Sequence, residues 1–409
     1  MYTKSFRHSR SSHRPFAARI THHARPFSRG GRGGQPRGRR VGERIDPSRF
    51  VNKAVITEEA EHFIPEHSFN DFQIDLTLKR AIEAKKFEIP TPIQDRTIPY
   101  VLKNADVVGI ANTGTGKTAA FLIPLIDKVL RNRNERVLIV VPTRELAVQI
   151  DTELREFAKG MRIFSVSCVG GVGIGAQIAG LRHSYNFVIG TPGRLKDLID
   201  RKMIPLSLFK TIVLDEADRM LDMGFIGDMR FIVSLMPKGR QTLFFSATIS
   251  REIEILIKDF CKEPVRISVK TGDTARNVEQ DVVKVARGAD KLDILHDLLN
   301  QKEFSKVLIF GRTKHGAERL SKELLRRGFK AESIHGNKSQ PKRQRALGLF
   351  RDSHIQVLVA TDVAARGLDI ADVSHVINYD IPATYNDYVH RIGRTGRGNK
   401  RGKALTFVE

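Results

Sequence analysis

The chain has 409 residues, of which 41% are hydrophobic, and a formal net charge of +23. This length suits roughly two to three α/β domains, and no apolar run approaches the roughly 18 residues that a membrane-spanning helix needs. The two cysteines, Cys168 and Cys261, lack metal-ligand spacing and exclude a disulfide framework, which fits a reducing compartment. Because the net charge is so positive, we expect a polyanionic partner, and nucleic acid rather than a membrane surface.

The basic charge is concentrated at the beginning of the chain. The first fifty residues hold thirteen Lys or Arg and two acids, Glu43 and Asp46. Residues 1–67 are rich in Arg, Ser, His, Gly and Pro, so we predict a disordered basic tail. Its Arg-Gly stretches suit RNA, since Arg combines charge with stacking on bases. Two alternatives stay open: a tail that only aids solubility, and a transit peptide, which the glycine cluster disfavours.

From Phe69 onward, short β-branched runs alternate with helical patterns. The predicted strands are 107–110, 137–141, 163–169, 187–190, 211–214 and 242–245, then 307–310, 331–334, 357–360, 376–379 and 404–408. Continuous apolar strands separated by helices predict parallel sheets covered on both faces, with ligands beyond the carboxyl ends of the strands. We predict an α/β fold of two domains, 68–270 and 280–409, joined by a polar linker at 271–279. A site placed between them would open and close.

Residues 107–121, VVGIANTGTGKTAAF, form a predicted strand, a loop of small residues and a helix start. Backbone N–H groups and the helix dipole favour an anion at Gly116, Lys117 can reach phosphates, and the Thr118 hydroxyl can ligate Mg²⁺. The stretch therefore predicts a P-loop for a nucleoside triphosphate. Ala111 stands where the generic pattern has Gly, and an ordinary Gly-rich turn is the alternative.

Acidic residues follow the predicted strand that ends at Leu214. In a chain with a P-loop, this is the Walker B arrangement, in which Asp215 would hold Mg²⁺ and Glu216 would orient or deprotonate the attacking water. A helix N-terminus enriched in acids is the alternative, and the preceding P-loop disfavours it.

The letters DEAD at 215–218 are the name-giving motif of the DEAD-box RNA helicases, and residues 69–409 resemble that family, with almost every motif in order. The resemblance implies two RecA-like domains, ATP and Mg²⁺ as cofactors, and RNA as a partner. Residues 87–94, FEIPTPIQ, resemble the Q motif, in which Gln94 reads the adenine edge and Phe69 stacks on its ring; Ala111 is the form that the family usually shows. The implied nucleotide-binding residues are Phe69, Phe87, Gln94, Thr113, Gly114, Thr115, Gly116, Lys117, Thr118 and Asp369.

Three further motifs follow predicted strands of the first series and resemble those that grip the RNA backbone: PTRELAVQ at 142–149, GG at 170–171 and TPGRL at 191–195. Cations, hydroxyls, backbone N–H groups and helix N-termini suit phosphates and do not read base edges, so binding should be largely independent of sequence. Taken singly, such motifs are ordinary helix starts. The implied RNA-binding residues are Arg144, Gly171, Thr191, Arg194 and Thr361.

The remaining motifs concern coupling and hydrolysis. SAT at 246–248 resembles the motif that links ATP hydrolysis to RNA separation, and is otherwise a helix N-cap. HRIGRTGR at 390–397 resembles the motif whose arginine fingers reach the γ-phosphate, a contact worth on the order of 10³ to 10⁵ in rate; from spacing alone it would be a basic surface face. The implied coupling residues are Ser246, Thr248 and His390, and the implied catalytic residues are Lys117, Glu216, Arg394 and Arg397.

Together, these motifs indicate an ATP-dependent RNA helicase that unwinds short duplexes or remodels ribonucleoproteins as two domains close. We expect a cytoplasmic location and ribosomal or RNA-decay proteins as partners. A non-catalytic RNA clamp is disfavoured because Glu216 and the arginines are present, and a DNA-directed helicase because of the Q motif and DEAD letters. The sequence ends after the last predicted strand, where the family usually continues into a helix, so we expect a fragment or a minimal second domain.

Overall fold

The structure is a computed structural model, and it describes residues 50–51, 63–112, 114–269, 278–365, 370, 372–396 and 402–408. Most of the predicted tail and linker lies outside these residues. None of the helices in the described ranges has the length and apolar content that crossing a bilayer requires.

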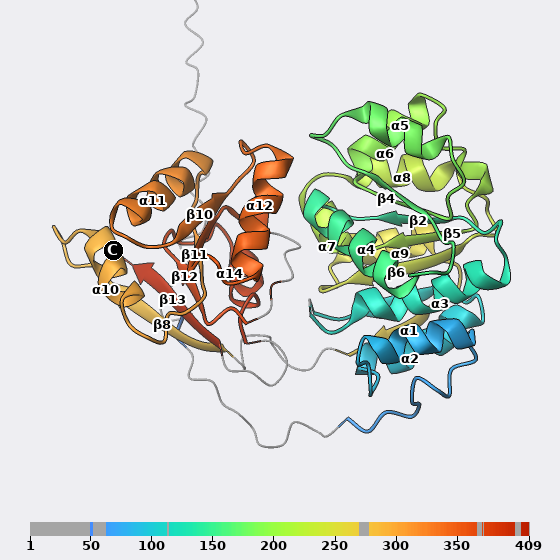
Figure 1. Ribbon diagram of the computed structural model, residues 1–409, viewed down its shortest axis with the longest axis horizontal. Coiled ribbons are helices and arrows are strands. Elements are labelled where there is room, and N and C mark those ends of the chain that lie inside the picture. Colours follow the sequence, from blue (N-terminus) through green and yellow to red (C-terminus); the bar gives the residue numbers. More distant parts are fainter. Residues whose placement is uncertain are drawn as a thin grey trace, which may run out of the picture. The chain divides into compact units, whose positions relative to one another are not determined.

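The first domain is built on a seven-stranded sheet in which every pair is parallel, in the order β3-β4-β2-β5-β6-β1-β7 (Figure 1). Its strands are β1 (Val107–Ile110), β2 (Val137–Val140), β3 (Ser165–Cys168), β4 (Phe187–Gly190), β5 (Thr211–Leu214), β6 (Gln241–Ser246) and β7 (Val265–Ser268). Its helices are α1 (Leu76–Ala84), α2 (Pro92–Leu102), α3 (Lys117–Arg131), α4 (Arg144–Phe157), α5 (Ile174–Leu181), α6 (Pro192–Asp200), α7 (Ala217–Asp222), α8 (Ile226–Ser234) and α9 (Arg251–Phe260), with a short 3₁₀ turn, η2 (Leu206–Leu208).

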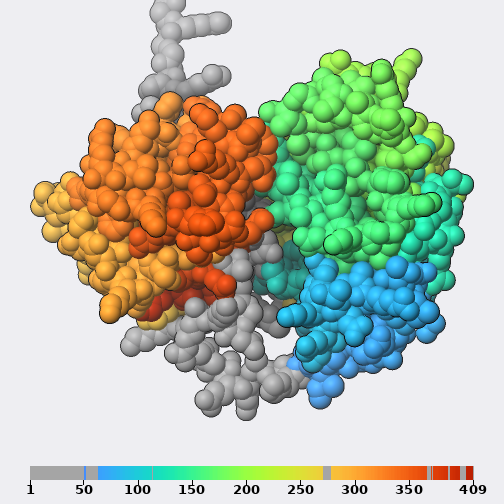
Figure 2. All heavy atoms as spheres, viewed as in Figure 1, coloured from blue at the N-terminus to red at the C-terminus, as the bar shows by residue number. Residues whose placement is uncertain are grey.

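Alternate residues of each strand enter opposite cores of this domain. Val107 packs with α1 to α4, whereas Val108 packs with α6, α8 and α9. This period of two follows from strand geometry and explains why the strands are apolar throughout. Figure 2 shows the segment that carries α1 and α2, in blue, seated against the green body of the same domain.

The second domain is built on a six-stranded parallel sheet in the order β10-β11-β9-β12-β13-β8. Its strands are β8 (Val278–Lys284), β9 (Val307–Phe310), β10 (Ala331–Ile334), β11 (Val357–Ala360), β12 (His375–Asn378) and β13 (Gly402–Val408). Its helices are α10 (Lys291–Leu299), α11 (Lys314–Arg326), α12 (Gln340–Arg351), α13 (Asp362–Ala365) and α14 (Tyr385–Ile392). Helices α12 to α14 contribute to one core and α10 and α11 to the other.

The predicted fold class is confirmed, with differences at the edges. Strands β7 and β8 were not predicted, because each lies at the edge of a sheet and carries polar residues on its exposed side. The buried side chain of Val278 starts β8 inside the range predicted as linker. Order also begins before Phe69, since the backbone N–H groups of Glu66 and His67 donate to the carboxylate of Asp95.

Candidate functional site

The strand order gathers the candidate residues of the first domain along one edge of its sheet. Strands β5, β6 and β1 are neighbours, so the acids after β5, the SAT motif at the end of β6 and the loop after β1 meet at their carboxyl ends. Strands β3, β4 and β2 lie beside them and are followed by Gly171, Thr191 and Arg144. The sheet thus places a phosphate-sized loop beside a row of groups suited to a second anion.

The loop after β1 folds around the amino group of Lys117. This side chain is 7% exposed, and its Nζ donates to the carbonyl oxygens of Ala111 at 2.7 Å and Asn112 at 3.3 Å. Gly116 precedes helix α3 with φ +92°, a left-handed conformation that glycine adopts readily. A Cβ at this position would lie 2.4 Å from Nε2 of Gln94, so a larger residue would displace the Gln94 side chain and would be strained at this φ.

Gln94 ties helix α2 to this loop. Its Nε2 donates to the carbonyl oxygen of Gly116 at 3.1 Å, and its Oε1 accepts from the N–H of Thr91 at 3.0 Å. An amide has two N–H donors and an oxygen with two lone pairs, so one of each remains for a ligand. The predicted stacking partner, Phe69, is 5% exposed and meets Phe87 edge-on at 5.9 Å between ring centroids. Its packing makes it part of the domain core.

The two acids after β5 are buried. Asp215 is 3% exposed, and burial raises the pKa of its carboxyl to about 6, although the nearby positive charge of Lys117 acts to lower this pKa. Glu216 is 4% exposed and has φ 53° and ψ 49°, a left-handed conformation that costs free energy in a non-glycine residue. Its Oε2 lies 3.3 Å from Nη1 of Arg219 without hydrogen-bond alignment, and this buried oxygen has no hydrogen-bond partner. Such an oxygen can accept from a water or a ligand.

Asp218 has a structural role that sequence analysis missed. Its Oδ2 accepts from the N–H of Ala247 at 3.1 Å and from both the N–H and the hydroxyl of Thr248 at 3.0 Å. The Ser246 hydroxyl donates to the carbonyl oxygen of Thr248 at 2.7 Å. The turn after β6 is therefore held to the helix that follows the acids. The sequence holds no local signal for this contact, because it depends on β6 lying beside β5 in the sheet.

The groups suited to a second anion are also preorganised. The guanidinium of Arg144 lies against the backbone of Gly171, where a Cβ would be 1.9 Å from Nη1, and Gly171 has φ +73°. Arg194 donates to Oε1 of Gln177 at 3.0 Å, which fixes its guanidinium after β4. Thr191 is the N-cap of α6. A cation, a helix start and a glycine turn thus lie after three adjacent strands.

In the second domain, α14 places its basic residues beside the carboxyl end of β9. His390, Arg391 and Arg394 line a small hollow together with Phe310 and Asp362. Arg394 is 4% exposed and its Nε donates to the carbonyl oxygen of His390 at 3.4 Å.

Thr361 follows β11 and is 8% exposed, and its N–H donates to the carbonyl oxygen of Ile334. Three predicted site residues lie outside the described residues: Thr113, Asp369 and Arg397.

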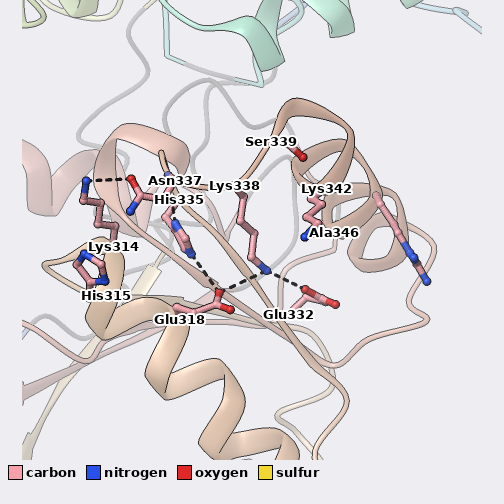
Figure 3. A pocket seen from close by; sticks show the side chains of 11 residues that line it. Lys314, His315, Glu318, Glu332, His335, Asn337, Lys338, Ser339, Lys342 and Ala346 are labelled. Carbon is pink, nitrogen blue, oxygen red and sulfur yellow. Dashed lines mark hydrogen bonds and ion pairs between the residues drawn. The ribbon is translucent and has the colours of Figure 1, made fainter. Parts of the chain in front are cut away.

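A larger pocket of about 710 Å³ lies between α11, β10 and α12 (Figure 3). Glu318 lines this pocket, and its Oε2 accepts from Ser333 at 2.5 Å and lies 3.1 Å from Nε2 of His335 and 3.5 Å from Nζ of Lys338. These contacts, that of Ser333 first, lower the pKa of Glu318 to about 2. Two acids line the pocket against four cationic side chains, so it favours an anion. The cationic residues are Lys314, Lys338, Lys342 and Arg345.

Two family models match the chain. The DEAD/DEAH box helicase model covers residues 91–256, and the helicase conserved C-terminal domain model covers residues 290–399. The DEAD-box ATP-dependent RNA helicase CshA of Bacillus subtilis (strain 168) is 46% identical over 343 residues, which are 83% of this chain and 69% of CshA.

Solved structures extend the likeness to both sheets. S. cerevisiae Dbp5 bound to RNA and ADP BeF3 matches with a TM-score of 0.74 and 32% identity over 84% of this chain and 89% of Dbp5. Mss116p bound to ssRNA and AMP-PNP matches with a TM-score of 0.74 and 30% identity over 82% of this chain and 72% of Mss116p. The fold of two tandem RecA-like domains is thus shared with proteins solved with nucleotide analogues and RNA.

Proposed function

The chain belongs to the DEAD-box RNA helicase family, and we propose that it couples RNA-stimulated ATP hydrolysis to the local unwinding of RNA duplexes or the remodelling of ribonucleoproteins. The observation that carries the proposal is the carboxyl edge of the first sheet. It sets the P-loop and two buried acids beside Arg144, Gly171 and Thr191. One domain therefore offers a triphosphate site next to a site for a phosphate backbone.

In this proposal the first domain binds the nucleotide. Lys117 exchanges its contacts with loop carbonyls for the β- and γ-phosphates, and Gln94 offers its remaining donor and acceptor to the adenine edge. The remaining cofactor-binding residues are Phe69, Phe87, Thr113, Gly114, Thr115 and Gly116 in this domain and Asp369, for the ribose, in the second. Glu216 is the acid that orients or deprotonates the attacking water, since its Oε2 is buried without a hydrogen-bond partner.

The chemistry of Thr118 and Asp215 fits Mg²⁺. No cluster of three or more His, Cys, Asp or Glu side chains forms a metal site in the described ranges. Mg²⁺ in nucleotide sites is held by one or two protein groups plus phosphates and waters, which a hydroxyl and a carboxylate at this edge can supply. When bound, the ion neutralises phosphate charge.

Arginines of the second domain complete the proposed active site. Arg394 and Arg397 act as fingers that stabilise charge on the transferred phosphoryl group. Because they belong to one domain and the P-loop to the other, hydrolysis requires closure, and RNA bound by both domains favours that closure. ATP and RNA should then raise each other's affinity by the same factor. Ser246, Thr248 and His390 are the proposed coupling residues.

RNA is bound through its backbone in this proposal. Arg144, Gly171, Thr191 and Arg194 contact phosphates from the first domain and Thr361 from the second, with little dependence on sequence. The excess of cations around Glu318 supports a further phosphate contact on the second domain. We also propose a cytoplasmic location, with ribosomal or RNA-decay proteins as partners.

The test is the ATPase rate of the full chain with single-stranded RNA and with DNA of the same sequence. We expect strong stimulation by RNA and little by DNA. The variant Lys117→Met supplies the background from contaminating enzymes. Equal stimulation by the two nucleic acids would overturn the RNA assignment, and no stimulation by either would overturn the coupling.

A further inference from the structure

Phe50 lies far from the second domain in the sequence and yet belongs to its core. Its side chain is fully buried, and it packs in the same cluster as Val278 of β8 and Tyr388 of α14. The ring centroids of Phe50 and Tyr388 are 4.7 Å apart with planes tilted by 52°. The next residue, Val51, is 54% exposed. One aromatic side chain is therefore inserted, and its neighbour faces solvent.

The site that receives Phe50 is built from buried side chains that are hydrogen-bonded to each other. Tyr388 is itself fully buried, and its hydroxyl donates to Oε1 of Gln280 on β8 at 2.9 Å. Gln280 is 3% exposed and sits two residues after Val278, where the chain enters the second domain. Phe50 thus docks beside the point at which the linker arrives, on the helix that leads to Arg394.

The other end of this segment is held by the first domain. The N–H groups of Glu66 and His67 donate to the Asp95 carboxylate at 2.9 and 3.1 Å, and Asp95 is 1% exposed on α2. Helix α2 also packs against β7, the strand from which the linker departs. Both chain segments therefore leave the first domain from neighbouring elements and reach the second at neighbouring side chains.

We propose that Phe50 is an intramolecular anchor: by docking in the core of the second domain, it joins the two domains through a second stretch of chain beside the linker. The sixteen peptide steps from residue 50 to residue 66 reach at most roughly 55 Å, and the nine steps from 269 to 278 roughly 30 Å. A single linker limits the distance between the two domains and leaves their relative rotation free. A second connection restricts rotation, which raises the effective concentration of each domain near the other. This inference rests on the proposed function where it predicts activity.

The first test uses the absence of tryptophan from the sequence. Phe50→Trp in the full chain introduces a single tryptophan, which can be excited selectively over the six tyrosines, and Val51→Trp is the matched control one residue away. We expect blue-shifted emission and protection from iodide quenching for the first variant, and solvent-like emission with strong quenching for the second. Equal quenching of the two would overturn the anchor, whatever the protein's activity.

The second test concerns the connection itself. Phe50→Ala should raise the RNA concentration for half-maximal ATPase by roughly threefold or more, with kcat at saturating RNA within about twofold, because a tether alters the effective concentration of one domain near the other and leaves the catalytic groups in place. Phe50→Leu should restore most of the affinity, and Val51→Ala should have no effect. An unchanged half-maximal RNA concentration in Phe50→Ala would overturn the proposal.

A cut in the chain separates tethering from local packing. Replacing residues 53–59 with a specific protease sequence and cleaving the folded protein severs the connection, and RNA affinity is compared at high salt, where the contribution of the basic tail is suppressed. We expect the same loss of RNA affinity as in Phe50→Ala. If cleavage changes nothing, the second connection is refuted. If the uncut protein shows no RNA stimulation, the proposed function fails instead, and the fluorescence test still decides the docking.

Discussion

Arg391 and Asp362 form a two-armed ion pair in the second domain, with Nε 2.5 Å from Oδ1 and Nη2 2.7 Å from Oδ2. Nη1 of Arg391 also donates to the carbonyl oxygen of Asp380 at 2.7 Å, and the guanidinium lies 5.0 Å from the ring centroid of Phe310. Arg391 is 2% exposed. The first arginine of the HRIGRTGR motif is therefore a structural residue, and not part of a basic surface face.

Removing this guanidinium should destabilise the second domain. Arg391→Met leaves Asp362 without its partner, and loss of one member of a largely buried pair costs about 2–4 kcal/mol in the free energy of unfolding. Arg326→Met is the control, since Arg326 pairs with Glu323 on the surface of α11 and should cost under about 1 kcal/mol. Urea unfolding of the full chain measures both, and equal losses would contradict the structural role.

Glu216→Gln should separate binding from hydrolysis. The amide keeps the size of the buried side chain and removes the carboxylate, so ATP and RNA should still bind while the turnover rate falls by about 10² or more. The exposed residue Glu83 supplies the control Glu83→Gln, with an unchanged rate expected. Steady-state ATPase and equilibrium RNA binding measure the two effects. Hydrolysis by Glu216→Gln near the original rate would exclude the general-base role.

His375 should make the second domain sensitive to acid. It stacks on Phe304 with ring centroids 3.8 Å apart, and burial lowers its pKa from 6.5 to about 4. Because the unfolded chain takes up the proton first, stability should fall as pH decreases from about 6.5 to about 4, by at most about 1.4 kcal/mol per pH unit. Above about pH 6.5, neutral His375 makes its full contribution to the free energy of unfolding.

The variant His375→Phe isolates the effect, since it keeps an aromatic ring against Phe304 and cannot take up a proton. Melting temperatures of the two proteins between pH 7 and pH 4.5 should diverge as the pH falls, with the original protein losing more. Parallel curves would show that His375 does not titrate differently on unfolding.

Deleting residues 1–45 should leave RNA-stimulated ATPase largely intact and weaken RNA affinity at low salt. The deleted stretch carries most of the N-terminal cationic residues. For single strands, the logarithm of affinity falls with the logarithm of salt by about 0.7 per phosphate engaged, so the shortened protein should show a shallower slope. Unchanged affinity at low salt would reduce the tail to an aid to solubility. A longer deletion, of residues 1–60, also removes Phe50. Any further loss of RNA affinity relative to the deletion of residues 1–45 therefore measures the anchor rather than the charge of the tail.

Sequence patterns predicted the central strands well because burial on both faces leaves no polar positions in them. The strands at 107–110, 187–190 and 307–310 have the predicted bounds. The edge strands β7 and β8 were not predicted, because an exposed edge tolerates polar residues and a polar segment resembles a loop in the sequence. The motif letters also pointed to residues that the strand order brings to one edge of the first sheet, the loop after β1 and the acids after β5.

Contacts between distant residues could not be predicted from local patterns. Phe50 lies in a basic, Gly- and Ser-rich stretch that indicates disorder, and nearly the whole helicase core separates it from Tyr388. Similarly, nothing in the letters DEAD states that Asp218 holds the turn at Thr248. Such pairings depend on strand order, which periodicity does not specify.

The pairing of β8 with β13 has a consequence for synthesis. Strand β8 is the first of its sheet to leave the ribosome, and its partner in the sheet is the last, at residues 402–408. At about 5–20 residues per second, β8 waits roughly 6 to 24 s with an unpaired edge. The exposed charges of Glu279, Asp281 and Lys284 oppose association with other nascent chains during that interval. The same polar residues that make β8 resemble a loop in the sequence therefore lower the tendency of the unfinished chain to associate with others.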